Sequence, residues 1–153
     1  MQDRIERLEQ IEQIRCLKVR YCMLCDTGYD ADKLSGLFTN DGCWDGGDLG
    51  CHEGRDSVRR FFSRMPGTMS LAVHHITNSA IELDLPGGRA HGTWYLLQMA
   101  TLTADNRAVW LSGVYEDDLV LEPDGWKFER MKISTRFFSP YESGWAETPL
   151  LEM

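Results

Sequence analysis

The segment VHHITNSAIELDL, residues 73–85, decides the fold because it is rich in residues that favour β-strands. Three later segments have the same composition: residues 90–103, 108–121 and 126–138. Turn-forming residues separate the four segments at 86–88, 104–106 and 123–125. The sequence therefore predicts four consecutive strands joined by short turns.

Helical periodicity precedes the predicted strands. Apolar residues spaced by three and four within residues 5–24 predict a long amphipathic helix that stops at Gly28. A short second helix is predicted within residues 29–38, and residues 38–42 are expected to turn the chain.

A third helix is predicted after a glycine-rich loop at residues 46–50. It carries Val58, Phe61 and Phe62 and ends at Pro66-Gly67. Three helices followed by a four-stranded meander indicate an α+β domain whose antiparallel sheet buries one face against the helices. A strongly curved sheet would leave a pocket.

Length and charge limit the functional classes. The chain has 153 residues and a net charge of -8, with its basic residues scattered. Such a chain forms one domain, and its charge argues against nucleic acid or an anionic membrane as a partner. No segment approaches the roughly 20 apolar residues of a membrane span. We expect a soluble cytoplasmic protein that binds a small ligand.

The five cysteines do not predict a metal site. Cys22 and Cys25 have the C-x-x-C spacing of a zinc knuckle but lie within a periodic helix, and Cys43, Cys51 and His52 are not spaced as a second knuckle. Without a secretory segment, free thiols in a reducing compartment are expected. Glycine-rich nucleotide-binding motifs are also absent, so no cofactor is predicted.

A carboxylate follows the apolar end of the first predicted helix. Residues 19–25 are apolar nearly all round except for Arg20, which predicts that this end is enclosed on most sides. Asp26 lies about 140° from Tyr21 on the helical wheel, so the two do not share a narrow face. The simplest interpretation is an exposed carboxylate and a core tyrosine; acid-base chemistry needs a further partner.

His74 and His75 offer that partner. Neighbouring residues of a strand face opposite sides of the sheet, so only one of the two imidazoles can enter a pocket. Counted back from Ile81 and Leu83, strict alternation turns His75 inward and His74 outward. A bulge between the histidines and Ile81 would reverse this assignment.

Five short motifs follow one another along the chain: Ile14-Arg15-x-Leu17-Lys18-x-Arg20-Tyr21 with Asp26, then Leu37-Phe38-Thr39-x-Asp41-x-x-Trp44, Gly54-Arg55-Asp56-x-Val58, His74-His75-Ile76-Thr77-Asn78 and Asp124-Gly125-Trp126-Lys127-Phe128. Their combination resembles the SnoaL-like branch of the nuclear transport factor 2-like superfamily, over nearly the whole chain to about Phe138. Members similar in the Tyr, Asp and His pattern include scytalone dehydratase, bile acid 7α-dehydratase and hexachlorocyclohexane dehydrochlorinase, which are cofactor-independent eliminating enzymes.

The resemblance implies a cone-shaped fold: three N-terminal helices packed on a curved, mostly antiparallel sheet that encloses a pocket. Residues 1–138 would form this cone domain, and residues 139–153 a C-terminal tail packed on the domain or on a neighbouring subunit. The expected ligand is a small hydrophobic or aromatic substrate. Relatives also imply a homodimer or homotrimer.

The resemblance assigns the catalytic roles to Tyr21, Asp26 and His74, with His75 in reserve. Asp26 would orient His74, which would remove a proton from substrate carbon, and Tyr21 would hydrogen-bond the substrate or protonate the departing oxygen. Further residues are expected to bind the substrate: Trp44, Trp94, Tyr95, Tyr115 and Arg136. Trp94 falls near the position of a second histidine in scytalone dehydratase, which leaves the substrate and the leaving group open.

Three functional classes are therefore considered. The first is a cofactor-independent lyase that eliminates water, halide or formaldehyde from a cyclic or aromatic substrate. The second is another acid-base enzyme with the same pocket: an isomerase, a polyketide-type cyclase or an epoxide hydrolase. The third is a non-catalytic binding or assembly subunit like those of ring-hydroxylating dioxygenases.

Overall fold

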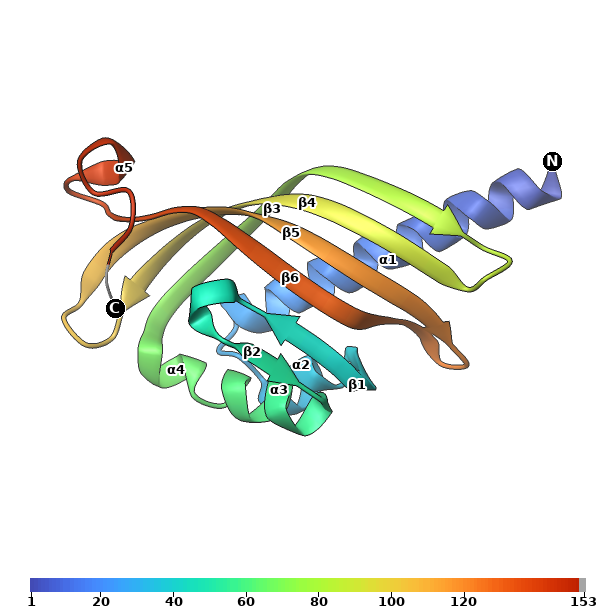
Figure 1. The fold of residues 1–153 in the computed structure, drawn as a ribbon, viewed down its shortest axis with the longest axis horizontal. Coiled ribbons are helices and arrows are strands. Elements are labelled where there is room, and N and C mark those ends of the chain that lie inside the picture. Colours follow the sequence, from blue (N-terminus) through green and yellow to red (C-terminus); the bar gives the residue numbers. More distant parts are fainter. Residues whose placement is uncertain (152–153) are drawn as a thin grey trace.

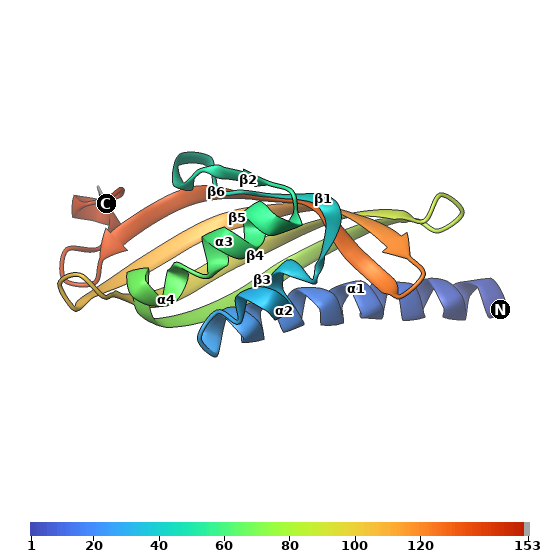
Figure 2. The ribbon, with the colours of Figure 1, turned by 90° about the horizontal axis from the view of Figure 1, so that it is seen from below.

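The computed structural model describes residues 1–151 as a curved six-stranded sheet with helices on its concave face (Figures 1 and 2). The helices are α1 (Gln2–Asp26), α2 (Ala31–Ser35), the 3-10 turn η1 (Gly47–Leu49), α3 (Arg55–Phe62), α4 (Met65–Thr68) and α5 (Gly144–Glu147). The strands are β1 (Phe38–Asp45), β2 (Cys51–Glu53), β3 (Met69–Asp84), β4 (Arg89–Leu102), β5 (Arg107–Glu122) and β6 (Gly125–Pro140). The predicted α+β cone is confirmed.

The sheet contains two strands that the sequence pattern did not predict. Its order is β2-β1-β6-β5-β4-β3, with β1 parallel to β6 and every other neighbouring pair antiparallel. The predicted four-stranded meander corresponds to β3 to β6. β1 and β2 extend that meander beyond β6, on the side where α3 lies (Figure 2).

The predicted turn at residues 38–42 is wrong, because these residues begin β1. Their turn-forming composition is accommodated as an irregularity, since the pairing of β1 with β6 shifts between Phe38 and Cys43. Gly42 lies within the irregular stretch, and a Cβ there would be 2.9 Å from the carbonyl oxygen of Phe128. Glycine therefore allows the close approach of two backbones.

The long helix α1 is buried along one narrow stripe: Ile14, Lys18, Tyr21, Cys22 and Cys25. Val19 is 53% exposed and Met23 is 61% exposed, so the prediction that this end is enclosed on most sides is wrong. The reason is geometric, because a helix lying on a single sheet buries only the side that faces the sheet. The N-terminal turns extend beyond the strands in Figure 1.

Residues 139–151 pack on the end of the sheet rather than extending from it. The Phe138 N–H donates to the carbonyl of Pro149 at 2.9 Å, and the Leu151 N–H donates to the carbonyl of Phe138 at 2.7 Å. The Trp145 ring of α5 stacks on Phe137 with 4.8 Å between ring centroids. β6 itself continues to Pro140, past the predicted domain boundary.

Gly92 makes room for the indole of Trp94 on the inner face of β4. A Cβ at Gly92 would be 2.9 Å from the indole nitrogen, and Trp94 is only 3% exposed. We expect Gly92→Ala to lower the free energy of unfolding by about 1–3 kcal/mol, because the packed indole cannot move away without strain. Urea unfolding measures this difference, and an unchanged midpoint would contradict the tight packing at this position.

Candidate active site

A cavity of about 320 Å³ lies between the helices and the concave face of the sheet. Side chains from α1, α3 and all six strands form its wall, and most of them are aromatic or aliphatic. The volume is that of a small organic ligand. The cone thus encloses the kind of pocket that the family resemblance implied.

The strand β3 presents His74 to this cavity. Its pairing with β4 shifts by one residue between Thr77 and Ala80, and Asn78 within the shift has a φ of 49°. This bulge reverses the alternation counted from Ile81 and Leu83, so His74 turns inward and His75 is exposed. The alternative that required a bulge is the one observed.

The Asp26 carboxylate contacts both the main chain and the side chain of His74. One carboxylate oxygen lies 2.6 Å from the imidazole Nδ1, and the backbone N–H of His74 donates to both carboxylate oxygens at 3.1 Å. The His74 side chain is only 5% exposed and that of Asp26 is 27% exposed. A carboxylate on Nδ1 favours the tautomer with hydrogen there, which leaves the Nε2 lone pair available as a base.

Tyr21 stands in the same cavity as a neutral phenol. Burial, with a further contribution from the neighbouring Tyr115, raises the pKa of Tyr21 well above its ordinary value. The Trp44 indole N–H donates to the Tyr21 hydroxyl at 3.1 Å. Burial likewise raises the pKa of Tyr115. The protonated phenols of Tyr21 and Tyr115 can therefore donate hydrogen bonds, and Trp44 fixes the position of the first.

Three of the five residues expected to bind substrate lie elsewhere. Tyr95 and Arg136 face the outer side of the sheet, where the Arg136 guanidinium lies 4.7 Å from the centroid of the Tyr95 ring. Tyr95 follows the inward-facing Trp94, and adjacent residues in a strand cannot share a face. Trp94 faces inward but does not line the cavity. Trp44 and Tyr115 do line it.

The cavity wall also contains residues that the sequence analysis did not select. The His52 imidazole stacks on Phe61 with 4.4 Å between centroids, and Phe61 stacks on Trp44 at 4.2 Å. Gln98 pairs with His74 across β3 and β4 and is 4% exposed. The only sequence signal for His52 was its position after a glycine-rich loop, and that position shows nothing of the cavity it borders.

His52 is expected to stay neutral to a lower pH than an ordinary imidazole. Burial lowers its pKa below 6.5, a hydrogen bond to the backbone carbonyl of Leu49 opposes the change, and the nearby Arg64 charge lowers the pKa further. A histidine kept neutral by folding contributes its full stability above pH 6.5 and loses it as the pH falls. An NMR titration should place its midpoint below 6.5, and Arg64→Gln should move the midpoint upward. A midpoint above 6.5 would contradict this electrostatic environment.

A buried ion pair connects α1 to the sheet beside the cavity. The Lys18 ammonium lies 2.8 Å from an Asp117 carboxylate oxygen, and the two side chains are 1% and 0% exposed. The same ammonium is 3.5 Å from the centroid of the Tyr115 ring. Burial lowers the pKa of Lys18 and raises that of Asp117, while each charge opposes the effect on the other. The pair fixes Tyr115 relative to α1.

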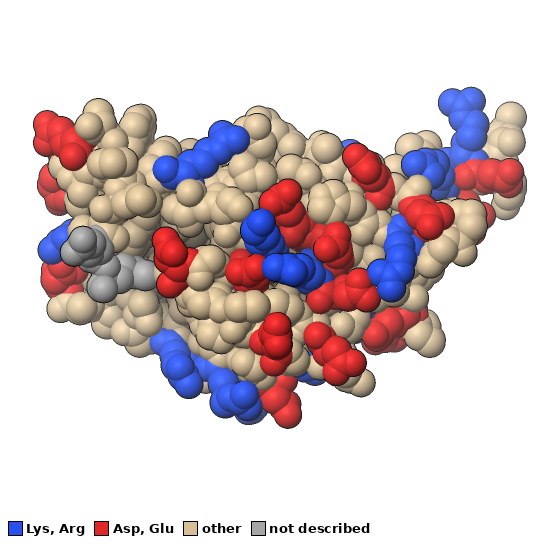
Figure 3. Space-filling model, in the orientation of Figure 1, with Lys and Arg blue, Asp and Glu red and all other residues tan. Residues whose placement is uncertain are grey.

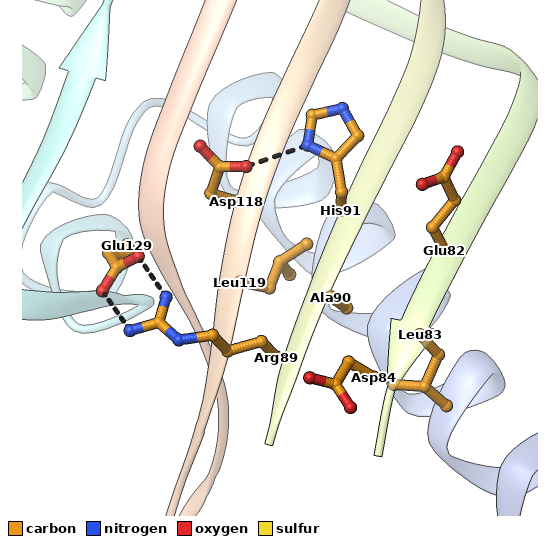
Figure 4. A pocket seen from close by; sticks show the side chains of 9 residues that line it. All are labelled: Glu82, Leu83, Asp84, Arg89, Ala90, His91, Asp118, Leu119 and Glu129. Carbon is orange, nitrogen blue, oxygen red and sulfur yellow. Dashed lines mark hydrogen bonds and ion pairs between the residues drawn. The ribbon is translucent and has the colours of Figure 1, made fainter. Parts of the chain in front are cut away.

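A larger groove of about 580 Å³ lies on the outer face of the sheet (Figure 4). Four of its polar side chains form two pairs: His91 Nδ1 is 2.8 Å from Asp118, and the Arg89 guanidinium is 2.8 Å from Glu129. Acidic and basic side chains also mix over the middle of this face in Figure 3. An apolar ligand would have to displace water from these ions, so the enclosed aromatic cavity is the better candidate site.

Within residues 1–151, no helix is both long and apolar enough to cross a membrane. In the same residues, no three His, Cys, Asp or Glu side chains gather as potential ligands of a metal ion.

Known structures have the same fold. A protein from Novosphingobium aromaticivorans, provisionally named a scytalone dehydratase, superposes with a TM-score of 0.83 at 22% identity, covering 92% of each chain. Hexachlorocyclohexane dehydrochlorinase LinA type 3 from Novosphingobium barchaimii gives a TM-score of 0.78 at 19% identity, covering 89% of this chain and 92% of the other. These likenesses concern the fold.

Sequence comparison identifies the family. An uncharacterized protein of Mycobacterium tuberculosis is 28% identical over 109 residues, which cover 70% of this chain and 72% of the relative. The model of the SnoaL-like domain matches residues 6–132. This match spans most of the chain, from α1 into β6, and includes Tyr21, Asp26 and His74. The protein therefore belongs to the family of SnoaL-like domains, within the nuclear transport factor 2-like superfamily.

Proposed function

We propose that the protein is a cofactor-independent lyase that eliminates water or another small group from a small cyclic or aromatic substrate. The observation that carries the proposal is the contact of 2.6 Å between Asp26 and His74 Nδ1, at the wall of an aromatic cavity. An imidazole oriented by a carboxylate is an effective general base. The cavity wall offers an apolar surface to the ring of the substrate.

In the proposed reaction, His74 Nε2 removes a proton from a substrate carbon. The electron pair of that C–H bond forms a carbon–carbon double bond, and the bond from the adjacent carbon to the leaving group breaks. Tyr21 donates its phenol hydrogen to a departing oxygen, which leaves as water. Asp26 stabilises the imidazolium that forms at His74. Proton transfer from the imidazolium through the pocket then restores the phenol.

The structural neighbours guide the choice of test compounds. Two of them bear the names scytalone dehydratase and hexachlorocyclohexane dehydrochlorinase, so scytalone and hexachlorocyclohexane represent loss of water and loss of hydrogen chloride. Each compound is incubated separately with the wild-type protein and with the His74→Gln variant, and the masses of the products are measured by mass spectrometry. We expect the wild-type protein alone to form a product lighter by one small molecule from at least one of them.

Other outcomes distinguish the competing classes. A product of unchanged mass would favour an isomerase, because the same base can return its proton to another carbon. Equal conversion by the wild-type protein and His74→Gln would exclude His74 as the base. Binding of both compounds in the cavity without any conversion would favour a non-catalytic ligand-binding protein.

A further inference from the structure

Cys43 of β1 and Cys51 of β2 bring two free thiols into contact. Their sulfur atoms are 3.2 Å apart, and the two strands are antiparallel neighbours. Cys43 pairs with Glu53 and Cys51 pairs with Asp45, so both cysteines lie on the same face of the hairpin. A disulfide has its sulfurs about 2 Å apart, which requires a further approach of about 1 Å.

The connection between the two strands can supply that small movement. It contains Gly46, Gly47 and Gly50, and the last two have φ values of 60° and 98°. Glycine adopts such angles without strain and resists adjustment less than other residues. Formation of the disulfide would close only this short glycine-rich loop.

The two thiols differ in exposure. Cys51 is exposed, whereas Cys43 is half-buried and pairs with Arg130 of β6. Burial, with the hydrogen bond to Cys51, raises the pKa of Cys43 to about 12. Cys43 is therefore protonated at neutral pH, and Cys51 is the sulfur that an oxidant reaches first.

The other cysteines provide internal comparisons. Cys22 and Cys25 are buried in α1, and burial raises the pKa of Cys22 to about 12 and that of Cys25 well above its ordinary value. Cys16 is exposed, but its thiol faces a carboxylate oxygen of Glu12 at 3.9 Å. Cys51 thus differs from Cys16, Cys22 and Cys25 because it is both exposed and in contact with another cysteine.

We propose that Cys43 and Cys51 form a redox-active dithiol that hydroperoxides convert to a disulfide. The Cys51 thiol first attacks the peroxide: its sulfur gains an oxygen to become a sulfenic acid, and an alcohol, or water from hydrogen peroxide, leaves. The Cys43 sulfur then attacks the Cys51 sulfur, the S–O bond breaks, and water leaves as the S–S bond forms. Two thiols are oxidised and one peroxide is reduced.

The disulfide would fasten one wall of the cavity. Trp44 directly follows Cys43 and His52 directly follows Cys51, and both rings line the cavity. Trp44 also holds the Tyr21 hydroxyl. Oxidation therefore restrains the hairpin that carries these groups. We expect the oxidised protein to melt about 5 °C higher than the reduced protein, since a short loop is closed in the unfolded chain.

The test treats the reduced protein with one equivalent of hydrogen peroxide, followed by iodoacetamide to cap remaining thiols. A protease that cuts at Asp45 and Asp48 separates the two cysteines, so a linkage joins two peptides in the mass spectrum. We expect the linkage between Cys43 and Cys51, with Cys16 alkylated. Cys43→Ser should instead give a Cys51 sulfenic acid that dimedone traps.

Cys51→Ser is the matched control and should show neither the linkage nor the increase in Tm. Because Cys51 is exposed, we expect this variant to fold, and circular dichroism verifies it. Three results would overturn the proposal: Cys43 and Cys51 both alkylated after peroxide treatment, a disulfide between two molecules through Cys16, or equal Tm values for the oxidised and reduced protein. These readouts require no substrate, so they are independent of the proposed elimination.

Discussion

Replacing Asp26 with asparagine should lower kcat for the elimination by about 100- to 10,000-fold, the usual contribution of general acid-base catalysis. The amide oxygen of asparagine can still accept the backbone N–H of His74. Its NH₂ group would instead donate to Nδ1, which moves the imidazole hydrogen to Nε2. The nitrogen that faces the substrate would then lack a lone pair for the proton.

The chain contains a matched control for this substitution. His91 and Asp118 form a second histidine–aspartate contact, with Nδ1 2.8 Å from the carboxylate, in the outer groove of Figure 4. Asp118→Asn should leave kcat within about twofold, because this contact does not border the cavity. The kcat of both variants is measured with whichever of the two test compounds the wild-type protein converts. A folded Asp26→Asn protein with wild-type kcat would exclude the proposed mechanism.

Replacing Lys18 with methionine should lower the free energy of unfolding by about 3–5 kcal/mol, the cost of leaving one charge of a buried pair without its partner. Asp117 would then be fully buried without the ammonium at 2.8 Å. Burial already raises the pKa of Asp117, and removal of Lys18 would raise it further. Urea unfolding measures the loss, which should lessen at low pH, where the carboxylate takes up a proton.

The double variant Lys18→Met, Asp117→Leu distinguishes the cost of leaving a buried charge unpaired from the cost of altered packing. We expect it to recover most of the stability, because apolar residues of similar size remove both desolvation costs together. A single variant that costs less than about 1 kcal/mol would contradict the burial of an ionised pair. A double variant as unstable as the single one would indicate that packing around Tyr115 dominates.

Local patterns predicted much of the fold because they act over short distances. The turn residues between the four strand-like segments predicted the meander from β3 to β6, and the periodicity of residues 5–24 predicted α1. β1 was missed because its stability comes from parallel pairing with β6, about 90 residues later in the chain. Its own residues, including Gly42, have the composition of a turn.

Period-two counting did not predict which side chains enter the cavity. It favoured His75, whereas the bulge between Thr77 and Ala80 turns His74 inward. The position of a bulge depends on how a strand pairs with its neighbours and on the curvature of the sheet. The sequence of one strand therefore does not show where its bulge lies. The family motif selected His74 correctly as the residue that faces the cavity. Members of a family share the same strand pairing, so the position of a residue in the motif already reflects the bulge.

The sequence by itself determined the α+β class and the family, because periodicity and motif spacing are properties of the chain, and the family resemblance predicted Tyr21, Asp26 and His74 as one candidate site. Only the tertiary structure decided that the Asp26 carboxylate reaches His74, 48 residues away, and that Tyr95 and Arg136 lie outside the cavity. It also brought Cys43 to Cys51. These results depend on strand register and sheet curvature, which long-range hydrogen bonds and packing fix together.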